Sequence, residues 1–394
     1  MTLVVSLGCG YWSIRLGRAD LLAREATANA ARKSTELAPG NSKYLQYAAI
    51  TAEDNGGDGM PLRARAAQLN PLDSWNWIQL AAEAEVRSEI AAAERYLLRA
   101  FDVDRQFQPR WALANFYLRQ GDRDRALGWA RKTLDFGAGD LNAVFQLCWN
   151  TGSNGDEILG KAIPARPEVL VQYLAYLDAT SRPDEAEQVA GILLPVAGTE
   201  QEPALAAHCN RALGLGRAKD AIAVWNGLVE RGLIEGERVE PGAGRSLVNA
   251  GFAREFSGVG FDWAAQAIEG VTVERLTNGS GVRVDFSRNE PQNCVILGQY
   301  VTLMPQRKYR FRVHYEAPEM SGAGITWVIY DPRTKVILLS AGPSGLGSAE
   351  VEAEFQAPPE LSVARLELRY VREPGTVRPE GSIRFSHLEL GFAP

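Results

Sequence analysis

Two different spacings of hydrophobic residues divide the chain. Up to about residue 235, apolar and small residues recur three or four positions apart, as on one face of a helix. From about residue 245 they alternate with polar residues, as Phe311 and Val313 alternate with Arg310 and Arg312. Strict alternation is typical of strands with one buried and one wet face. The sequence therefore predicts a helical part followed by an all-β part.

The helical part repeats one unit. On the first helix of the unit, a large residue is followed by two smaller ones, and the second helix carries small residues. A shift of 34 residues, from Trp77 to Trp111, gives the same order of residue sizes again. Large residues fill the groove between two packed helices, and alanines let the two backbones approach. The recurring positions are Trp77, Leu80, Ala81, Ala84, Ala93, Leu97 and Ala100, then Trp111, Ala114, Asn115, Leu118, Ala126 and Ala130, and, with a shift of 33 in the other direction, Tyr44, Tyr47 and Ala48.

These spacings resemble the tetratricopeptide repeat family. Three units match across residues 21–136, and more degenerate units continue the helical pattern to about residue 235. The resemblance implies a solenoid over residues 21–236 whose concave groove binds a peptide or another protein. The alternative is that this half is only a rigid spacer. We also expect Trp77 and Trp111 to occupy equivalent buried positions.

The second part reads as about eight short strands, which indicates a sandwich or jelly roll over residues 245–394. The alternation changes phase in the last strand, between Phe385 and Leu388, and this predicts a β-bulge there. Trp263 stands at a strand entry and Trp327 alternates with isoleucines, so both indoles are expected in the core.

The order of elements in this part is distinctive. The runs that carry it are LVNAGF at 247–252, FDW at 261–263, GVRV at 281–284, QYVTLMP at 299–305 and KYRF at 308–311. They resemble the carbohydrate-binding-module jelly rolls, over about residues 246–392. They are particularly similar to the versions fused behind tetratricopeptide repeats in bacterial exopolysaccharide and exosortase-associated proteins. Ala253 and the pair Ser386 and His387 stand where that family often carries calcium-holding acids, so we expect no metal here.

A ligand of the β part would need exposed aromatic faces with polar neighbours. If strands 308–316 and 364–370 are neighbours in one sheet, four arginines form one basic row. Planar arginine donors suit an acidic sugar or a carboxylate-bearing partner. The alternative for this row is an ordinary solvated face. The candidate ligand-binding residues are Arg310, Arg312, Arg365, Arg369, Tyr300 and Tyr330.

The N-terminal residues 2–14 are uncharged and mostly apolar, and Arg15 and Arg18 follow them. A complete bilayer span needs about 20 residues, and a signal peptide begins with a positive region that is missing here. We interpret residues 1–20 as the remnant of an N-terminal membrane anchor or signal. The protein would then be exported, on the periplasmic side of the inner membrane or in the cell envelope. A buried first helix is the alternative.

Composition and motifs limit the classes of function that fit this chain. A net charge of −6 and a pI near 5.4 argue against a nucleic-acid binder. Four isolated cysteines argue against a zinc site, and isolated buried thiols are favoured over a disulfide within the solenoid. The sequence contains neither a phosphate-binding GxxxxGK[ST] loop nor an HExxH motif, and residues 342–346 miss GxSxG at the last position. We therefore expect no enzyme activity and no cofactor.

The two halves together predict a non-enzymatic exported adaptor. Its solenoid would bind a protein partner, and its jelly roll would bind a glycan or a partner, in cell-envelope or exopolysaccharide assembly. The alternative is an accessory structural subunit of an unrelated membrane complex, with protein contacts only. A glycan-degrading enzyme is the least favoured class, because neither half offers a deep catalytic scaffold.

Overall fold

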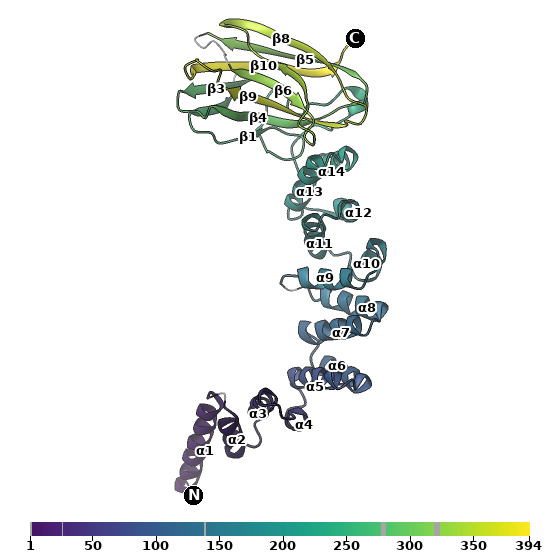
Figure 1. The fold of residues 1–394 in the computed structure, drawn as a ribbon, viewed down its shortest axis with the longest axis vertical. Helices are drawn as coiled ribbons and strands as arrows, with labels where there is room; N and C mark the ends of the chain where they lie inside the picture. The colour runs from purple at the N-terminus through teal and green to yellow at the C-terminus, as the bar shows by residue number, and fades with distance from the viewer. Residues whose placement is uncertain (1, 26, 138, 277–280, 319–323) are drawn as a thin grey trace. The chain divides into compact units, whose positions relative to one another are not determined.

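The computed structural model describes residues 2–25, 27–137, 139–276, 281–318 and 324–394, with side chains from Gly8 onward. The chain forms two compact units, Met1–Pro164 and Ala165–Pro394. Figure 1 labels the helices and strands in chain order.

The first unit is helical. Successive helices pack against each other, and the pairs α5 with α6 and α7 with α8 make the most extensive contacts. Several helices begin at a side-chain cap: Asp73 accepts from the Trp75 amide at 3.1 Å, and Asp122 from the Arg125 amide at 3.0 Å. The helices are α1 (Thr2–Ala23), α2 (Ala28–Leu37), α3 (Ser42–Asp54), α4 (Met60–Leu69), α5 (Ser74–Val86), α6 (Ile90–Val103), α7 (Phe107–Arg119), α8 (Arg123–Leu134), α9 (Asn142–Asn150) and α10 (Gly155–Lys161).

The predicted helical repeat is confirmed, but its register is not. Leu80 and Ala81 are buried in α5, and the residues buried in the same order in α7 are Leu113 and Ala114, 33 positions later. The expected shift of 34 is therefore wrong by one residue. Trp77 is the fourth residue of its helix and Trp111 the fifth, so the two indoles are not equivalent, and both are only half-buried. The small and aliphatic residues define the repeat because they form the helix–helix contact.

The C-terminal half of helix α1 packs on its neighbours. Ala19 is fully buried with Ala38 and Tyr44, whereas Tyr11 and Trp12 are 60% and 52% exposed. The alternative of a buried first helix is therefore wrong for residues 8–14, which are exposed. No described helix is both long and apolar enough to cross a bilayer. The anchor stays a prediction.

The second unit begins with four more helices, so the helical pattern extends to Glu230, as the degenerate repeats predicted. They are α11 (Pro167–Ala179), α12 (Pro183–Leu193), α13 (Glu202–Gly214) and α14 (Ala218–Glu230), with short 3₁₀ turns η1 (Leu194–Val196) and η2 (Pro241–Ala243).

Two antiparallel sheets pack face to face in the rest of this unit (Figure 1). One sheet has the order β1-β4-β9-β6-β7 and the other β2-β3-β10-β5-β8. The predicted sandwich is therefore confirmed. The strands are β1 (Ala264–Ala265), β2 (Val271–Arg275), β3 (Val282–Ser287), β4 (Asn293–Thr302), β5 (Lys308–Ala317), β6 (Ile325–Tyr330), β7 (Ile337–Ala341), β8 (Gly347–Gln356), β9 (Val363–Val371) and β10 (Glu380–Phe392).

The core of the sandwich follows the alternation. Trp263 and Trp327 are fully buried, with ring centroids 6.0 Å apart, so both indoles belong to the core as predicted. The register of β10 against β5 shifts between Ser386 and Glu389, which is the predicted bulge. His387 lies within this bulge and has a φ of 49°, a left-handed conformation. The bulge gives β10 one residue more than β5 between the paired positions on either side.

The predicted single basic surface is wrong. Arg310 and Arg312 lie on β5 in one sheet, and Arg365 and Arg369 lie on β9 in the other. Alternation correctly places all four guanidinium groups outside the core. It carries no information about which strands become neighbours, and here the two strands belong to different sheets.

The last helix pair packs on the sandwich through buried groups. Trp225 of α14 is fully buried, meets Phe261 edge-on at 5.9 Å and donates from Nε1 to the Glu237 carbonyl at 2.9 Å. Gly260 lies against the same indole and donates its amide hydrogen to Asn210 Oδ1 at 2.6 Å. These contacts cross the domain boundary expected between residues 236 and 245, and that boundary stays a prediction.

All four cysteines are free thiols. Cys148 and Cys209 are buried, and burial raises the pKa of each to about 12. The expectation of isolated buried thiols in the solenoid is therefore confirmed for Cys148 and Cys209, whereas Cys294 is half-buried and Cys9 is exposed.

Candidate functional site

The six candidate residues divide between two sites. Tyr300, Tyr330 and Arg365 line one cavity with Arg369 beside it, and Arg310 and Arg312 line another on the opposite sheet. We call the first the helix-facing pocket and the second the linker groove.

Strand register assembles the base of the helix-facing pocket. Arg365 on β9 pairs with Tyr300 on β4 and with Tyr330 on β6, so the arginine stands between two tyrosines. Its guanidinium carbon lies 4.5 Å from the centroid of the Tyr300 ring. The guanidinium of Arg369 lies 4.6 Å from the Tyr330 ring. Such cation–π contacts hold the charged groups and the rings in place.

Glu367 organises these groups. Its carboxylate is buried and accepts from Tyr330 Oη at 2.9 Å, from Arg369 Nε at 2.7 Å and from Arg365 Nε at 3.4 Å. Burial, with the nearby Glu367 carboxylate, raises the pKa of Tyr330 to about 12, so its hydroxyl remains a donor at neutral pH. Gly298 stands opposite Glu367 on β4, where a Cβ would lie 2.9 Å from Glu367 Cγ, so glycine leaves the room that this carboxylate needs.

One wall of the pocket comes from the turn between β6 and β7. Asp331 accepts from the Arg333 amide at 2.8 Å and from Thr334 Oγ1 at 2.9 Å, and its carbonyl accepts from the Lys335 amide at 2.8 Å. Lys335 has a φ of 63°, and its Nζ lies 5.4 Å from the Tyr330 ring. The turn thus places an ammonium group at the rim.

The opposite wall combines a loop with helix α13. Asp262 is buried and accepts from Ser257 N and Oγ at 3.0 and 2.8 Å, which fixes the loop that carries Gly260. Asn210 and Gly214 of α13 complete the lining. The volume of this open pocket is about 490 Å³, enough for a small polar ligand or a few sugar units.

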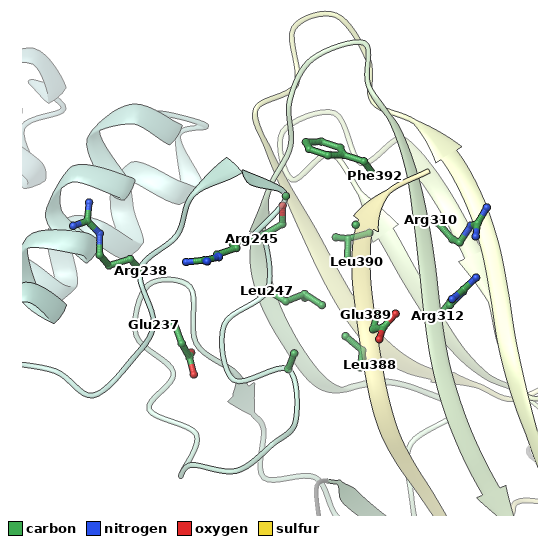
Figure 2. A pocket seen from close by; sticks show the side chains of 14 residues that line it. Glu237, Arg238, Arg245, Leu247, Arg310, Arg312, Leu388, Glu389, Leu390 and Phe392 are labelled. Carbon is green, nitrogen blue, oxygen red and sulfur yellow. The ribbon is translucent and has the colours of Figure 1, made fainter. Parts of the chain in front are cut away.

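The linker groove has a different character. Arg310 lies 3.2 Å from Glu352 and 3.1 Å from Glu354, and Arg312 lies 3.3 Å from Glu352, so β8 neutralises both arginines. Lys308 and Arg310 hold the pKa of Glu354 below its usual range. Figure 2 shows these arginines beside β10 and the apolar side chains of the groove, which encloses about 480 Å³. Those apolar side chains are Leu247, Leu388, Leu390 and Phe392.

A smaller cavity of about 230 Å³ lies in the first unit, between α5 and α7. Ala81 and Trp111 line it, and Arg119 holds Glu85 through two contacts of 2.7 Å at its edge. Small side chains on one helix beside a half-buried indole on the next leave room for an apolar side chain of a partner.

Sequence reasoning found part of the helix-facing pocket. It singled out Tyr300, Tyr330 and Arg365, and alternation puts Glu367 on the same outer face as the arginines on either side. Asn210 and Lys335 were missed. They come from a helix and a turn far from β9 in the chain, so no local pattern connects them.

Among the described residues, His, Cys, Asp and Glu side chains do not gather in threes with a geometry suited to a metal ion. A scan against known protein families finds no match for this sequence, and a search of curated proteins finds none either.

Solved structures similar to parts of the chain are remote. The crystal structure of MamA protein has a TM-score of 0.29 and 16% identity, and covers 49% of this chain and 92% of its own. PilF of Pseudomonas aeruginosa has a TM-score of 0.28 and 13% identity, and covers 56% of this chain and 90% of its own. A solved structure of CBM4 has a TM-score of 0.27 and 13% identity, and covers 34% of this chain and 87% of its own. At these values the similarities carry no argument about function, and the fold rests on the elements described above.

Proposed function

We propose that this protein is a non-enzymatic adaptor, which binds a protein through its helical repeats and a glycan or a partner through its β-sandwich. The observation that carries the proposal is the helix-facing pocket. Residues of four strands (β1, β4, β6 and β9), a turn, a loop and helix α13 converge there around one cavity. Tyrosines and charged donors in one enclosed site are the usual elements of a polar-ligand site.

The chemistry of the pocket favours binding over catalysis. Glycoside hydrolysis needs one carboxyl that gives a proton and another that attacks or activates water. Glu367 is held by Tyr330 and two arginines, and Asp262 by Ser257. Both carboxylates therefore act as structural acceptors, and ligand-binding is left to the donors around them.

The helical repeats support a protein partner. Stacked repeats present an extended surface, and the cavity between α5 and α7 offers an apolar recess on it. A rigid spacer remains the alternative for this part. In that case substitutions of exposed residues around the cavity would leave every interaction of the protein unchanged.

The proposal includes a place of action. The exposed apolar stretch of α1, with Tyr11, Trp12 and Ile14, supports membrane anchoring. We place the protein on the periplasmic side of the inner membrane or in the envelope, in exopolysaccharide assembly. This assignment rests on the family resemblance of the sequence. The rival function is an accessory subunit that makes only protein contacts.

A glycan array with the full chain tests the proposal. Gly214→Phe should abolish binding, because a Cβ at this pocket-lining position of α13 meets nothing within 4 Å and the ring can occupy the cavity. Gly191→Phe is the matched control, since Gly191 is also an open helical position, in α12 away from the pocket. If no glycan is bound, or if both variants bind as the parent does, the rival function is favoured.

A further inference from the structure

We propose that the helix-facing pocket takes a carboxylate-bearing sugar, such as a uronic acid unit, held by Arg365 and Lys335 of the sandwich and by Asn210 of α13. The inference rests on the proposed function and names the ligand class of the same site.

The acceptors of the pocket are already engaged. Glu367 accepts from Tyr330 and Arg369 on different oxygens, at 2.9 and 2.7 Å. Asp262 accepts two hydrogen bonds from Ser257. A ligand that offers mainly hydroxyl donors therefore finds few free acceptors on these side chains.

The donors of the pocket are in surplus. Arg365 uses only Nε, at 3.4 Å from Glu367, and its two terminal nitrogens make no hydrogen bond with any residue that the structure describes. The Lys335 ammonium likewise donates none within the described ranges, although it can donate three. A site with spare donors and engaged acceptors selects an acceptor-rich ligand.

Charge points to the same ligand. Arg365, Arg369 and Lys335 carry three positive charges, and the pocket holds two carboxylates, Glu367 and Asp262, so one more anion would balance the charges. A carboxylate matches the planar fork of an arginine with two parallel hydrogen bonds.

The tyrosine rings argue against simple stacking of a neutral sugar. Arg365 covers one face of Tyr300 at 4.5 Å, and Arg369 and Lys335 lie 4.6 and 5.4 Å from the Tyr330 ring. A pyranose ring that stacked on these faces would have to displace the cations. Recognition by the charged groups themselves avoids that cost.

Helix α13 contributes the remaining donor. The Oδ1 atom of Asn210 accepts from Gly260 N at 2.6 Å, so the amide is oriented and its nitrogen is left to donate. Gly260 is itself held against Trp225 of α14. The sugar site is thus a joint product of the last helix pair and the sandwich, and the sandwich alone would lack one wall.

Isothermal titration of the full chain tests this inference. The probes are short oligomers of galacturonate, glucuronate and mannuronate, each beside its methyl ester, which keeps the ring and removes the charge. We expect at least one acid form to bind, its ester to bind at least about tenfold more weakly, and Arg365→Gln to weaken binding by about ten- to a hundredfold, as for loss of a hydrogen bond to a charged group. Lys335→Ala should give a smaller loss.

Arg283→Gln is the matched control, because Arg283 also pairs with a carboxylate two residues along its strand, Asp285 at 2.9 Å, but lies on β3 of the opposite sheet and should leave the affinity unchanged. Thermal melts of each variant check folding, and Arg365→Lys, which keeps the charge and loses the fork, should bind with intermediate affinity. Equal binding of acid and ester, indifference to Arg365, or binding of none of the acids would overturn the inference. If neutral glycans still bind in a Gly214-dependent way, the proposed function survives that outcome. If no glycan binds at all, both fall.

Discussion

Gly260→Ala probes how the last helix pair contacts the sandwich. Gly260 has a φ of 56°, in the left-handed region. A Cβ built there would lie 2.5 Å from a ring carbon of Trp225 and 3.2 Å from Cys209 Sγ. Both neighbours belong to buried helix residues that cannot turn away into solvent. The substitution therefore combines backbone strain with a steric clash.

Two contributions set the expected loss of unfolding free energy. A non-glycine residue in the left-handed region costs about 1–2 kcal/mol. An extra methyl group in a packed interior costs about 1–3 kcal/mol. We expect Gly260→Ala to destabilise the second unit by about 2–5 kcal/mol. It should also weaken ligand binding, because a shift of the loop moves the amide of residue 260 away from Asn210 Oδ1.

Gly258→Ala separates the two contributions. Gly258 also has a left-handed φ, of 68°, but the nearest atom to its Cβ would be Ala264 Cβ at 3.8 Å. It should lose only the strain contribution of about 1–2 kcal/mol. Urea unfolding read by hydrogen exchange of individual peptides reports the second unit within the full chain. Equal losses for the two variants would refute the packing of Gly260 on Trp225.

Three further outcomes follow from the packing of the last helix pair and from the contact between Tyr330 and Glu367. A fragment of residues 165–394 should be more stable than one of residues 245–394; the shorter fragment should show β-type circular dichroism, and the longer one should add the helical signal of α11 to α14. Equal stability would mean that the helix pair contributes nothing to the sandwich. Trp225→Ala should cost about 3–5 kcal/mol in the full chain, the range for a large buried aromatic, measured by urea unfolding. Because the pKa of Tyr330 is raised to about 12, its stabilising effect is present below about pH 10, the ordinary tyrosine value, and is lost as the pH rises toward 12. Tyr330→Phe should flatten that decline, and a decline of unchanged steepness would argue against the contact with Glu367.

The sequence by itself determined the type of each element and the side of each strand that faces the core. Periods of 3.6 and 2 follow from helix and strand geometry, so a stretch such as 308–316 shows its buried face without any tertiary information. The same reasoning placed Trp263 and Trp327 inside and located the bulge in β10. The predicted repeat length was wrong by one residue, because the alignment was based on large residues such as Trp77. The contact between the helices is made by Leu80 and Ala81.

Only the tertiary structure decided which surfaces come together. Alternation assigns Arg310 and Arg365 to outer faces, but strand pairing places them on opposite sheets, since pairing depends on contacts between strands far apart in the chain. The helix-facing pocket depends on such contacts throughout. Asn210, Lys335 and Glu367 have no sequence spacing in common, and they meet because α13 packs on the loop before β1 while β9 lies between β4 and β6. Their proximity is a property of packing, which no local period encodes.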